Sequence, residues 1–185
     1  MAAQDLLDNI SIVLVRTKTP GNIGAVARCM MNMGLSRLVL VRPPKDDQSE
    51  AMKFAAGAEA VLRDAIRTET LQDALAGHGL VIGTSRHLGR HRRNIGTPRE
   101  MAGRIAFLLP QNRIALVFGR EVNGLEKEDM ALCNEFIAIP SSKSFPSLNL
   151  SHAVSIVAYE LFIATRVGPA SGGKTLAPAG ELESF

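Results

Sequence analysis

Five short apolar segments constrain the fold of this chain more than any other feature. They are ISIVLVR (residues 10–16), RLVLVRP (37–43), GLVIGTS (79–85), IALVFG (114–119) and EFIAIP (135–140). Each is rich in β-branched residues and nearly continuous in apolar character. Strands of this kind are typical of parallel sheets whose two faces are both buried. The segments therefore predict a sheet that is covered on each side.

Helical patterns fill the intervals between these segments. They fall at residues 22–33, 51–67 with a break, 71–76, 98–109, 126–133 and 149–166. Strands that alternate with helices predict an α/β fold with a mostly parallel sheet. Because 185 residues suffice for one well-packed domain, we expect a single domain over residues 1–167. Residues 168–185, rich in Gly, Pro, Ala and Ser, are expected to form a flexible C-terminal tail.

Composition excludes several classes of protein. No apolar run is long enough to cross a bilayer, and MAAQDLLDNI at the N-terminus lacks the basic flank and apolar stretch of a secretory signal. We therefore expect a cytoplasmic protein without a membrane partner. Cys29 and Cys133 lie in apolar periodic segments with no C-x-x-C and no companion His. This spacing predicts buried reduced thiols and no metal site.

The tail contains GPASGGKT (168–175), which fits the phosphate-binding pattern G-x-x-x-x-G-K-[ST] at every fixed position. Such a loop binds phosphates when a strand enters it and a helix leaves it, so that backbone N–H groups point at the ligand. Here a helical pattern precedes the loop, and the few residues that follow it predict no helix. We interpret the match as accidental.

Three stretches combine glycines with polar residues where strands end. In PGNIGAVARCMMNMG (20–34), Asn22 precedes a helix and Arg28 lies one turn beyond Gly24 on the same face. In LVFGREVNGL (116–125), Gly119 ends a buried strand and Glu121 follows it. Carboxyl ends of parallel strands are where ligands bind. The alternatives are an Asn cap with a solvated Arg, and a Glu that is favoured by a helix dipole.

The third stretch is IPSSKSFPSLNLSHAVSIVAYE (139–160). It begins at another strand end, and Ser147, Leu148 and Asn149 lead into an apolar helix. A Ser or Asn helix cap is the alternative here. Because three such stretches follow successive elements, we favour one shared site over three independent caps.

The stretches NIGAVAR, FGREVNGL and PSLNLSHAVSIVAYE resemble, in this order, the three motifs of the SpoU/TrmH branch of the SPOUT RNA methyltransferases. Their flanks are most similar to the TrmJ group of tRNA ribose methyltransferases, and the resemblance covers about residues 10–166. It implies a Rossmann-like, mostly parallel sheet with a C-terminal deep trefoil knot, and a homodimer. It also implies S-adenosylmethionine as methyl donor and an RNA ribose 2′-hydroxyl as acceptor, in the TrmJ group cytidine or uridine 32 of the tRNA anticodon loop. An rRNA methyltransferase and a non-catalytic RNA-binding module are the alternatives.

The resemblance also implies the site residues. No G-x-G-x-x-G follows the first strand, so the cofactor is expected at later strand ends. The cofactor-binding residues would be Thr84, Ser85, Arg86, Gly119, Ile139, Pro146, Ser147 and Leu148. The catalytic candidates are Arg28, Asn22, Glu121, Ser147 and Asn149. Because a free guanidinium is a poor base, Arg28 is expected to bind the adjacent phosphate and stabilise developing alkoxide, while Glu121 orients Arg28 or accepts the proton.

Positive charge is concentrated in RHLGRHRR (86–93), although the net charge of the chain is only +3. Four arginines in eight positions predict an anionic partner. We expect Arg86, Arg90, Arg92 and Arg93 to bind RNA phosphates; a solvated basic loop is the alternative. Where the family commonly has TSAR, this chain has GTSRHLGRHRR, so Arg86 is assigned to either the cofactor or the RNA.

The helical pattern at 149–166 is apolar on nearly all sides. A helix of this kind needs two partners. Burial within one subunit would provide them, but we favour a second subunit as one of the two.

Overall fold

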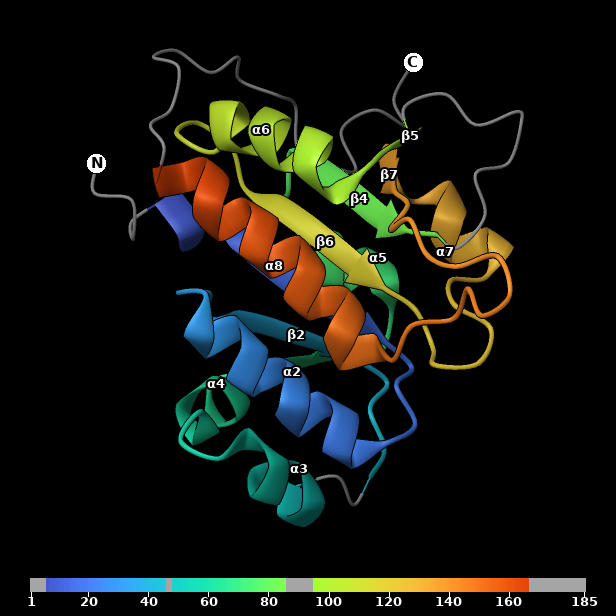
Figure 1. The fold of residues 1–185 in the computed structure, drawn as a ribbon. Helices are drawn as coiled ribbons and strands as arrows, with labels where there is room; N and C mark the ends of the chain where they lie inside the picture. Colours follow the sequence, from blue (N-terminus) through green and yellow to red (C-terminus); the bar gives the residue numbers. More distant parts are fainter. Residues whose placement is uncertain (1–5, 46–47, 86–94, 167–185) are drawn as a thin grey trace.

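The structure is a computed structural model that describes residues 6–45, 48–85 and 95–166. These residues form a seven-stranded sheet in the order β3-β2-β1-β6-β4-β7-β5, in which every neighbouring pair is parallel (Figure 1). The strands are β1 Ile10–Val15, β2 Arg37–Val41, β3 Ile66–Thr68, β4 Leu80–Thr84, β5 Ile95–Gly96, β6 Ile114–Phe118 and β7 Glu135–Ile137. The predicted α/β class and the five predicted strands are confirmed.

Helices cover both faces of the sheet. Its front face in Figure 1 carries α2 Pro20–Asn32, α6 Pro98–Leu108 and α8 Leu150–Arg166, with α3 Gln48–Ala55 and α4 Glu59–Arg63 packed beside α2. The other face is covered by α5 Leu71–Leu75 and α7 Lys127–Ala131. Alternate residues of each central strand enter the two cores; in β1, Ile12 faces the larger one and Val13 the smaller one. This explains the continuous apolar character of the strands.

Two edge strands escaped prediction. The helical pattern at 51–67 ends early, because α4 stops at Arg63 and Ile66–Thr68 then pairs with β2 as strand β3. The break within the pattern falls at Gly57, whose φ of +95° suits glycine. Ile66 is 51% exposed, so this edge strand lacks the apolar run that marks a buried one. The other missed strand, β5, has two residues and pairs with β7.

The two cysteines were predicted to be buried, and this was wrong, because both are free and partly exposed. Cys29 lies at the seam between α2 and α8, with its Sγ 3.7 Å from the carbonyl oxygen of Ser151. Cys133 follows α7, with its Sγ 3.4 Å from the carbonyl oxygen of Asp129. Cys29 thus lies between two packed helices and Cys133 at the end of a helix, and part of each side chain remains exposed to solvent.

Helix α2 is fixed against α3 by glycine. A Cβ at Gly24 would lie 2.0 Å from the carbonyl oxygen of Ala51, a distance that no side chain allows. The backbone of α3 thus rests directly on the backbone of α2. This packing accounts for one glycine of the first motif and holds the N-terminal end of α2 in place.

Two predictions fall on other parts of the chain. The tail at 168–185, with GPASGGKT, and the basic segment at 86–93 lie outside the described residues. Within the part that the structure describes, no helix has the length and apolar character that a bilayer crossing requires.

A buried histidine lies between α5 and β4, at the opposite end of the strands from the three motif segments. His78 is 7% exposed; its Nδ1 donates to the carbonyl oxygen of Leu75 at 3.1 Å, and its Nε2 accepts from the Ser11 hydroxyl at 3.0 Å. Burial lowers the pKa of His78, the positive charges of Arg113 and Arg37 lower it further, and together they outweigh the opposing effect of the Leu75 hydrogen bond. The neutral ring is thus the native form.

We expect the free energy of unfolding to decrease as the pH falls below about 6.5, the ordinary histidine pKa, because the unfolded chain then binds a proton that native His78 resists. Urea unfolding at pH 7.5 and 5.5 measures this decrease. His78→Gln should show a smaller decrease over the same interval. An equal decrease in both proteins would assign the pH dependence to other groups.

Candidate functional site

A cavity lies at the carboxyl ends of three adjacent strands. Strands β6, β4 and β7 are neighbours in the sheet, so the segments that follow them meet at one end (Figure 1). The cavity there has a volume of about 330 Å³, which is within the range of small-molecule sites. Seven predicted cofactor-binding residues line it: Thr84, Ser85, Gly119, Ile139, Pro146, Ser147 and Leu148. The eighth, Arg86, lies outside the described residues.

The walls of this cavity combine apolar side chains with small polar groups. Leu125, Ile137 and Leu150 are among the buried apolar residues, and hydroxyl groups come from Thr84 and Ser147. Such a lining suits a flat apolar ring that carries hydrogen-bonding edges.

The loop between β6 and α7 doubles back on itself to form one wall. The N–H of Arg120 donates to the carbonyl oxygen of Gly124 at 3.2 Å, and the N–H of Gly124 returns a bond to Arg120 at 2.9 Å. A Cβ at Gly119 would lie 2.1 Å from the carbonyl carbon of Gly124. Gly124 itself has a φ of +67°. The loop therefore closes because both positions are glycine.

Glu121, at the turn of this loop, reaches the N-terminus of α2. Its carboxylate accepts hydrogen bonds from the N–H groups of Lys18 and Thr19, at 3.2 and 3.1 Å, and from Nδ2 of Asn22 at 3.1 Å. Burial would raise the pKa of Glu121, but these hydrogen bonds, that of Asn22 foremost, hold it below its ordinary value. Glu121 is thus ionised at neutral pH. A helix dipole does favour it, but the helix is α2 and not the one that follows Glu121 in the chain.

Asn149 connects the third motif to the first. Its Oδ1 accepts from the N–H and the hydroxyl of Ser151, both at 2.8 Å, which caps α8. Its Nδ2 donates to Oδ1 of Asn22 at 3.0 Å. The side chain of Asn149 therefore both caps α8 and joins α8 to the site. A continuous chain of hydrogen bonds runs from Ser151 through the two asparagines to Glu121.

The structure brings four of the five catalytic candidates to this region. Asn22, Glu121 and Asn149 are hydrogen-bonded in series, and Ser147 lines the cavity. Arg28 is exposed on α2, and its guanidinium has no hydrogen bond or ion pair with any residue in the described ranges. The structure therefore does not join Arg28 to Glu121.

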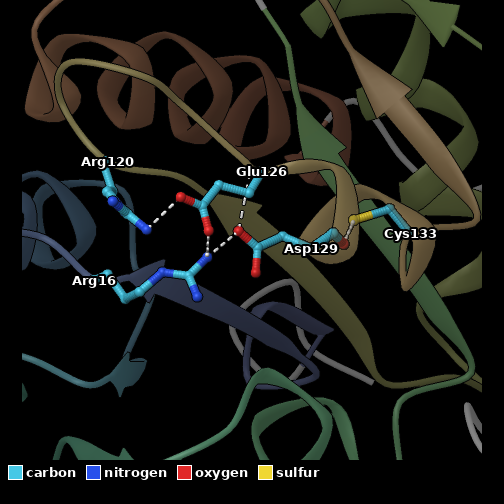
Figure 2. Close-up of polar contacts among 5 residues, drawn as sticks. All are labelled: Arg16, Arg120, Glu126, Asp129 and Cys133. Atoms are coloured by element: carbon cyan, nitrogen blue, oxygen red, sulfur yellow. Dashed lines mark hydrogen bonds and ion pairs between the residues drawn. The ribbon is translucent and has the colours of Figure 1, made fainter.

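Sequence reasoning missed a cluster of four charged residues on the other side of the same loops (Figure 2). Arg16, which follows β1, binds the carboxylates of Asp129 and, at 3.1 Å, Glu126. Arg120 binds the second oxygen of Glu126 at 2.5 Å. Glu126 and Asp129 also cap the start of α7 reciprocally. The spacing of Glu126 and Asp129 at a helix start was the only sequence signal of the cluster.

This cluster complements the contact of Glu121. The loop after β1 supplies Arg16 to the segment that follows β6, and that segment returns Glu121 to the loop after β1. The two segments therefore hold each other at two points. Arg120, next to Glu121, takes part in the cluster, so the ion pairs also fix the cavity wall.

Removing Arg16 should destabilise the fold, because Asp129 is 5% exposed and would keep a charge without its ion-pair partner. We expect Arg16→Ala to lower the free energy of unfolding by about 2 kcal/mol in urea titrations. Arg42→Ala is the matched control: Arg42 also follows a strand with positive φ, 47° against 51°, but its contact with Glu69 is 3.7 Å long and exposed. The control should lose about 0.5 kcal/mol or less from its ion pair. Equal losses would contradict a structural role for the cluster.

Comparison with known proteins is consistent with this architecture. The model of the SpoU rRNA Methylase family matches residues 9–159. A tRNA (cytidine/uridine-2′-O-)-methyltransferase TrmJ from Pectobacterium atrosepticum is 45% identical over 159 residues, which are 86% of this chain and 66% of the relative. A tRNA (cytidine/uridine/adenosine-2′-O-)-methyltransferase TrmJ from Pseudomonas aeruginosa is 44% identical over 86% of this chain and 62% of its own. The chain thus spans just under two thirds of the length of these curated relatives.

Solved structures of related proteins show the same fold over nearly the whole chain. The crystal structure of TrmJ from Z. mobilis superposes with a TM-score of 0.80 at 35% identity, over 94% of this chain and 75% of that one. A putative methylase family protein from Neisseria gonorrhoeae superposes with a TM-score of 0.86 at 33% identity, over 97% of this chain and 93% of that one. Because the family model matches most of the chain, the chain belongs to the SpoU rRNA methylase family.

Proposed function

We propose that this protein is an S-adenosylmethionine-dependent methyltransferase that modifies a ribose 2′-hydroxyl of RNA, with tRNA as its substrate. The observation that carries the proposal is that the second and third motif segments line one cavity, while Asn22 of the first motif is hydrogen-bonded to both through Glu121 and Asn149. The names of the relatives supply the substrate class, and we extend to this chain their cytidine or uridine acceptor in tRNA. Position 32 of the anticodon loop is the part of this proposal that rests on the resemblance of the motifs alone. A tRNA substrate also implies the cytoplasm as the place of action.

The residues of the cavity fit the proposed cofactor. Apolar walls from Leu125, Ile137 and Leu148 suit an adenine ring. Ser147 supplies a hydroxyl group at the wall, and the Thr84 hydroxyl, which donates to the carbonyl oxygen of Val117, keeps its oxygen as an acceptor. When bound, S-adenosylmethionine supplies an electrophilic methyl group on a sulfonium. The chain must then hold an RNA 2′-oxygen in line with that methyl group and favour its nucleophilic form.

The roles of the catalytic candidates follow from their contacts. Glu121 is a weak base, because its pKa is lowered and its carboxylate accepts three hydrogen bonds, so we assign it to holding Asn22 in place. Asn149 fixes the same amide from the other side. Arg28 is exposed and has five N–H donors available, so we assign it to the substrate phosphate and the developing alkoxide. Ser147 positions the reacting groups at the cavity wall.

The proposal includes a deep trefoil knot within a domain of residues 1–167, followed by a tail at 168–185. Its support is the order of the strands. Strand β7 lies between β4 and β5, although both of these precede it in the chain. The segment after β7 then passes the cavity before it enters α8 (Figure 1).

It also includes a homodimer. Helix α8 buries Val154, Val157 and Leu161 in the core, whereas Ile156, Tyr159 and Ile163 on its outer side are 37%, 51% and 40% exposed. Within the described part of the chain, α2 and α6 pack on the inner side of the helix, and these three apolar side chains remain on its outer side. A second subunit on the outer side would cover them.

One specific observation favours a second substrate class. The matching family is described by rRNA methylation, although the relatives of highest identity quoted above are named for tRNA. Incubation with labelled S-adenosylmethionine and purified tRNA or rRNA, followed by detection of 2′-O-methylated nucleosides, separates the two. Methyl transfer to neither RNA would overturn the proposed function.

Arg28→Ala should abolish methyl transfer and leave cofactor affinity within about twofold, since Arg28 is not among the residues that line the cavity. Single-turnover methylation of tRNA and calorimetry with S-adenosylmethionine measure the two effects. Lys53→Ala, which removes an exposed cation from α3, is the control and should retain activity. A loss of cofactor binding that exceeds the loss of turnover would contradict the assignment of Arg28 to the acceptor.

The basic segment at 86–93 gives a second expectation for RNA. If Arg90, Arg92 and Arg93 bind phosphates, replacing all three by Ala should reduce the dependence of log affinity on log salt by roughly two to three units. Cofactor affinity should not change. Filter binding of a tRNA transcript across a salt series measures the slope. An unchanged slope would mean that the segment is a solvated loop.

A further inference from the structure

The two most exposed large apolar side chains of the described residues lie on the two loops of the cavity. Val122, in the loop after β6, is 74% exposed and contributes to the cavity lining. Phe145, in the loop after β7, is 76% exposed and directly precedes Pro146, which also lines the cavity. The next in rank, Met31 and Phe54, are each 53% exposed. Single exposed apolar residues are common, but here the two extremes both flank one site.

Phe145 is presented by an ordered turn. The N–H of Phe145 donates to the carbonyl oxygen of Ser142 at 3.2 Å, and the hydroxyls of Ser142 and Ser144 are 2.8 Å apart. The hydroxyl of Ser141 closes the turn by donating to the carbonyl oxygen of Pro146 at 3.1 Å. Local hydrogen bonds thus hold the backbone in a conformation that leaves the phenyl ring in solvent. A ring that is held in this way loses little entropy when a ligand covers it.

Two exposed lysines lie on segments that belong to or contact the loops of this site. Lys143, in the same turn, and Lys18, whose N–H binds Glu121, are both exposed, and neither ammonium has a hydrogen bond or ion pair with the described residues. An exposed aromatic ring beside unpaired cations suits an unstacked nucleobase that is flanked by phosphates.

From these observations we infer that Phe145 and Val122 form two apolar lips that hold the base of the nucleotide to be methylated, with Phe145 as the stacking platform. The inference rests on the proposed function and adds a specificity-determining contact to it. The base binds to these two side chains outside the cavity, and the ribose attached to it then faces Glu121 and the cofactor-binding residues. Single-stranded or looped RNA would then be preferred to a duplex, where the base remains stacked.

The test is a double-mutant cycle in which one change is made in the protein and the other in the RNA. The wild-type protein is first used to map the methylated nucleotide in a tRNA transcript, and a second tRNA is made with an abasic ribose at that position. Fluorescence anisotropy then gives the affinity of each protein for each RNA. The wild type should bind the abasic tRNA about tenfold more weakly, whereas Phe145→Ala should bind both with the same reduced affinity. Phe145→Tyr should behave as the wild type.

Ile66→Ala is the matched control, because it truncates an exposed apolar residue on the edge strand β3. It should bind both RNAs as the wild type does, and calorimetry should give the same cofactor affinity for every variant. Discrimination by Phe145→Ala equal to that of the wild type would overturn the inference and leave the proposed function intact. So would a weakened dimer in sedimentation of Phe145→Ala with unchanged RNA discrimination, which would make the lips a subunit contact. A wild type that methylates no tRNA would overturn the tRNA assignment itself.

Discussion

The carboxylate of Glu121 at the N-terminus of α2 is the contact on which the site depends. Two backbone N–H groups of the preceding loop and the amide of Asn22 converge on it, and Asn22 in turn receives Asn149. One ionised side chain thus links the loop after β6 to α2 and, through a single amide, to α8. Charge-assisted hydrogen bonds of this kind are roughly twice as strong as neutral ones, and removal of the acceptor would leave three donors unpaired. The lowered pKa keeps the carboxylate charged, so this arrangement persists throughout the neutral range.

The ion pairs of Arg16 secure the same two segments from the opposite side of the sheet. Because Arg16 binds Asp129 and Glu126 while Glu121 binds Lys18 and Thr19, neither segment can shift without breaking contacts in both directions. Asp129 is almost fully buried, and its charge is offset by Arg16 and by the N–H of Glu126. A wall held in this way preorganises the cavity, which lowers the entropic cost of binding a ligand there.

The sequence predicted those parts of the fold that depend on burial. Central strands such as β1 and β6 were found because both of their faces are apolar, whereas β3 and β5 were missed because edge strands carry no such run. The residues of the cavity could be predicted from the sequence because they follow predicted strands and resemble known motifs. The Arg16–Asp129 pair joins residues 113 positions apart, and no local pattern connects them. That contact requires the strand order, which places β1 beside β6 although four strands separate them in the chain.

The distribution of unpaired groups around the cavity bears on its chemistry. The hydrogen-bonding capacity of Glu121 is largely used within the protein, since three of its roughly four acceptor positions are occupied. The side chains of Arg28, Lys18 and Lys143, by contrast, are exposed and keep their donors free of described partners. The exposed side chains that these segments leave unpaired are therefore cationic donors, while the carboxylate of Glu121 is committed to structure. An anionic polymer that develops further negative charge on an oxygen is the kind of substrate that such an arrangement stabilises.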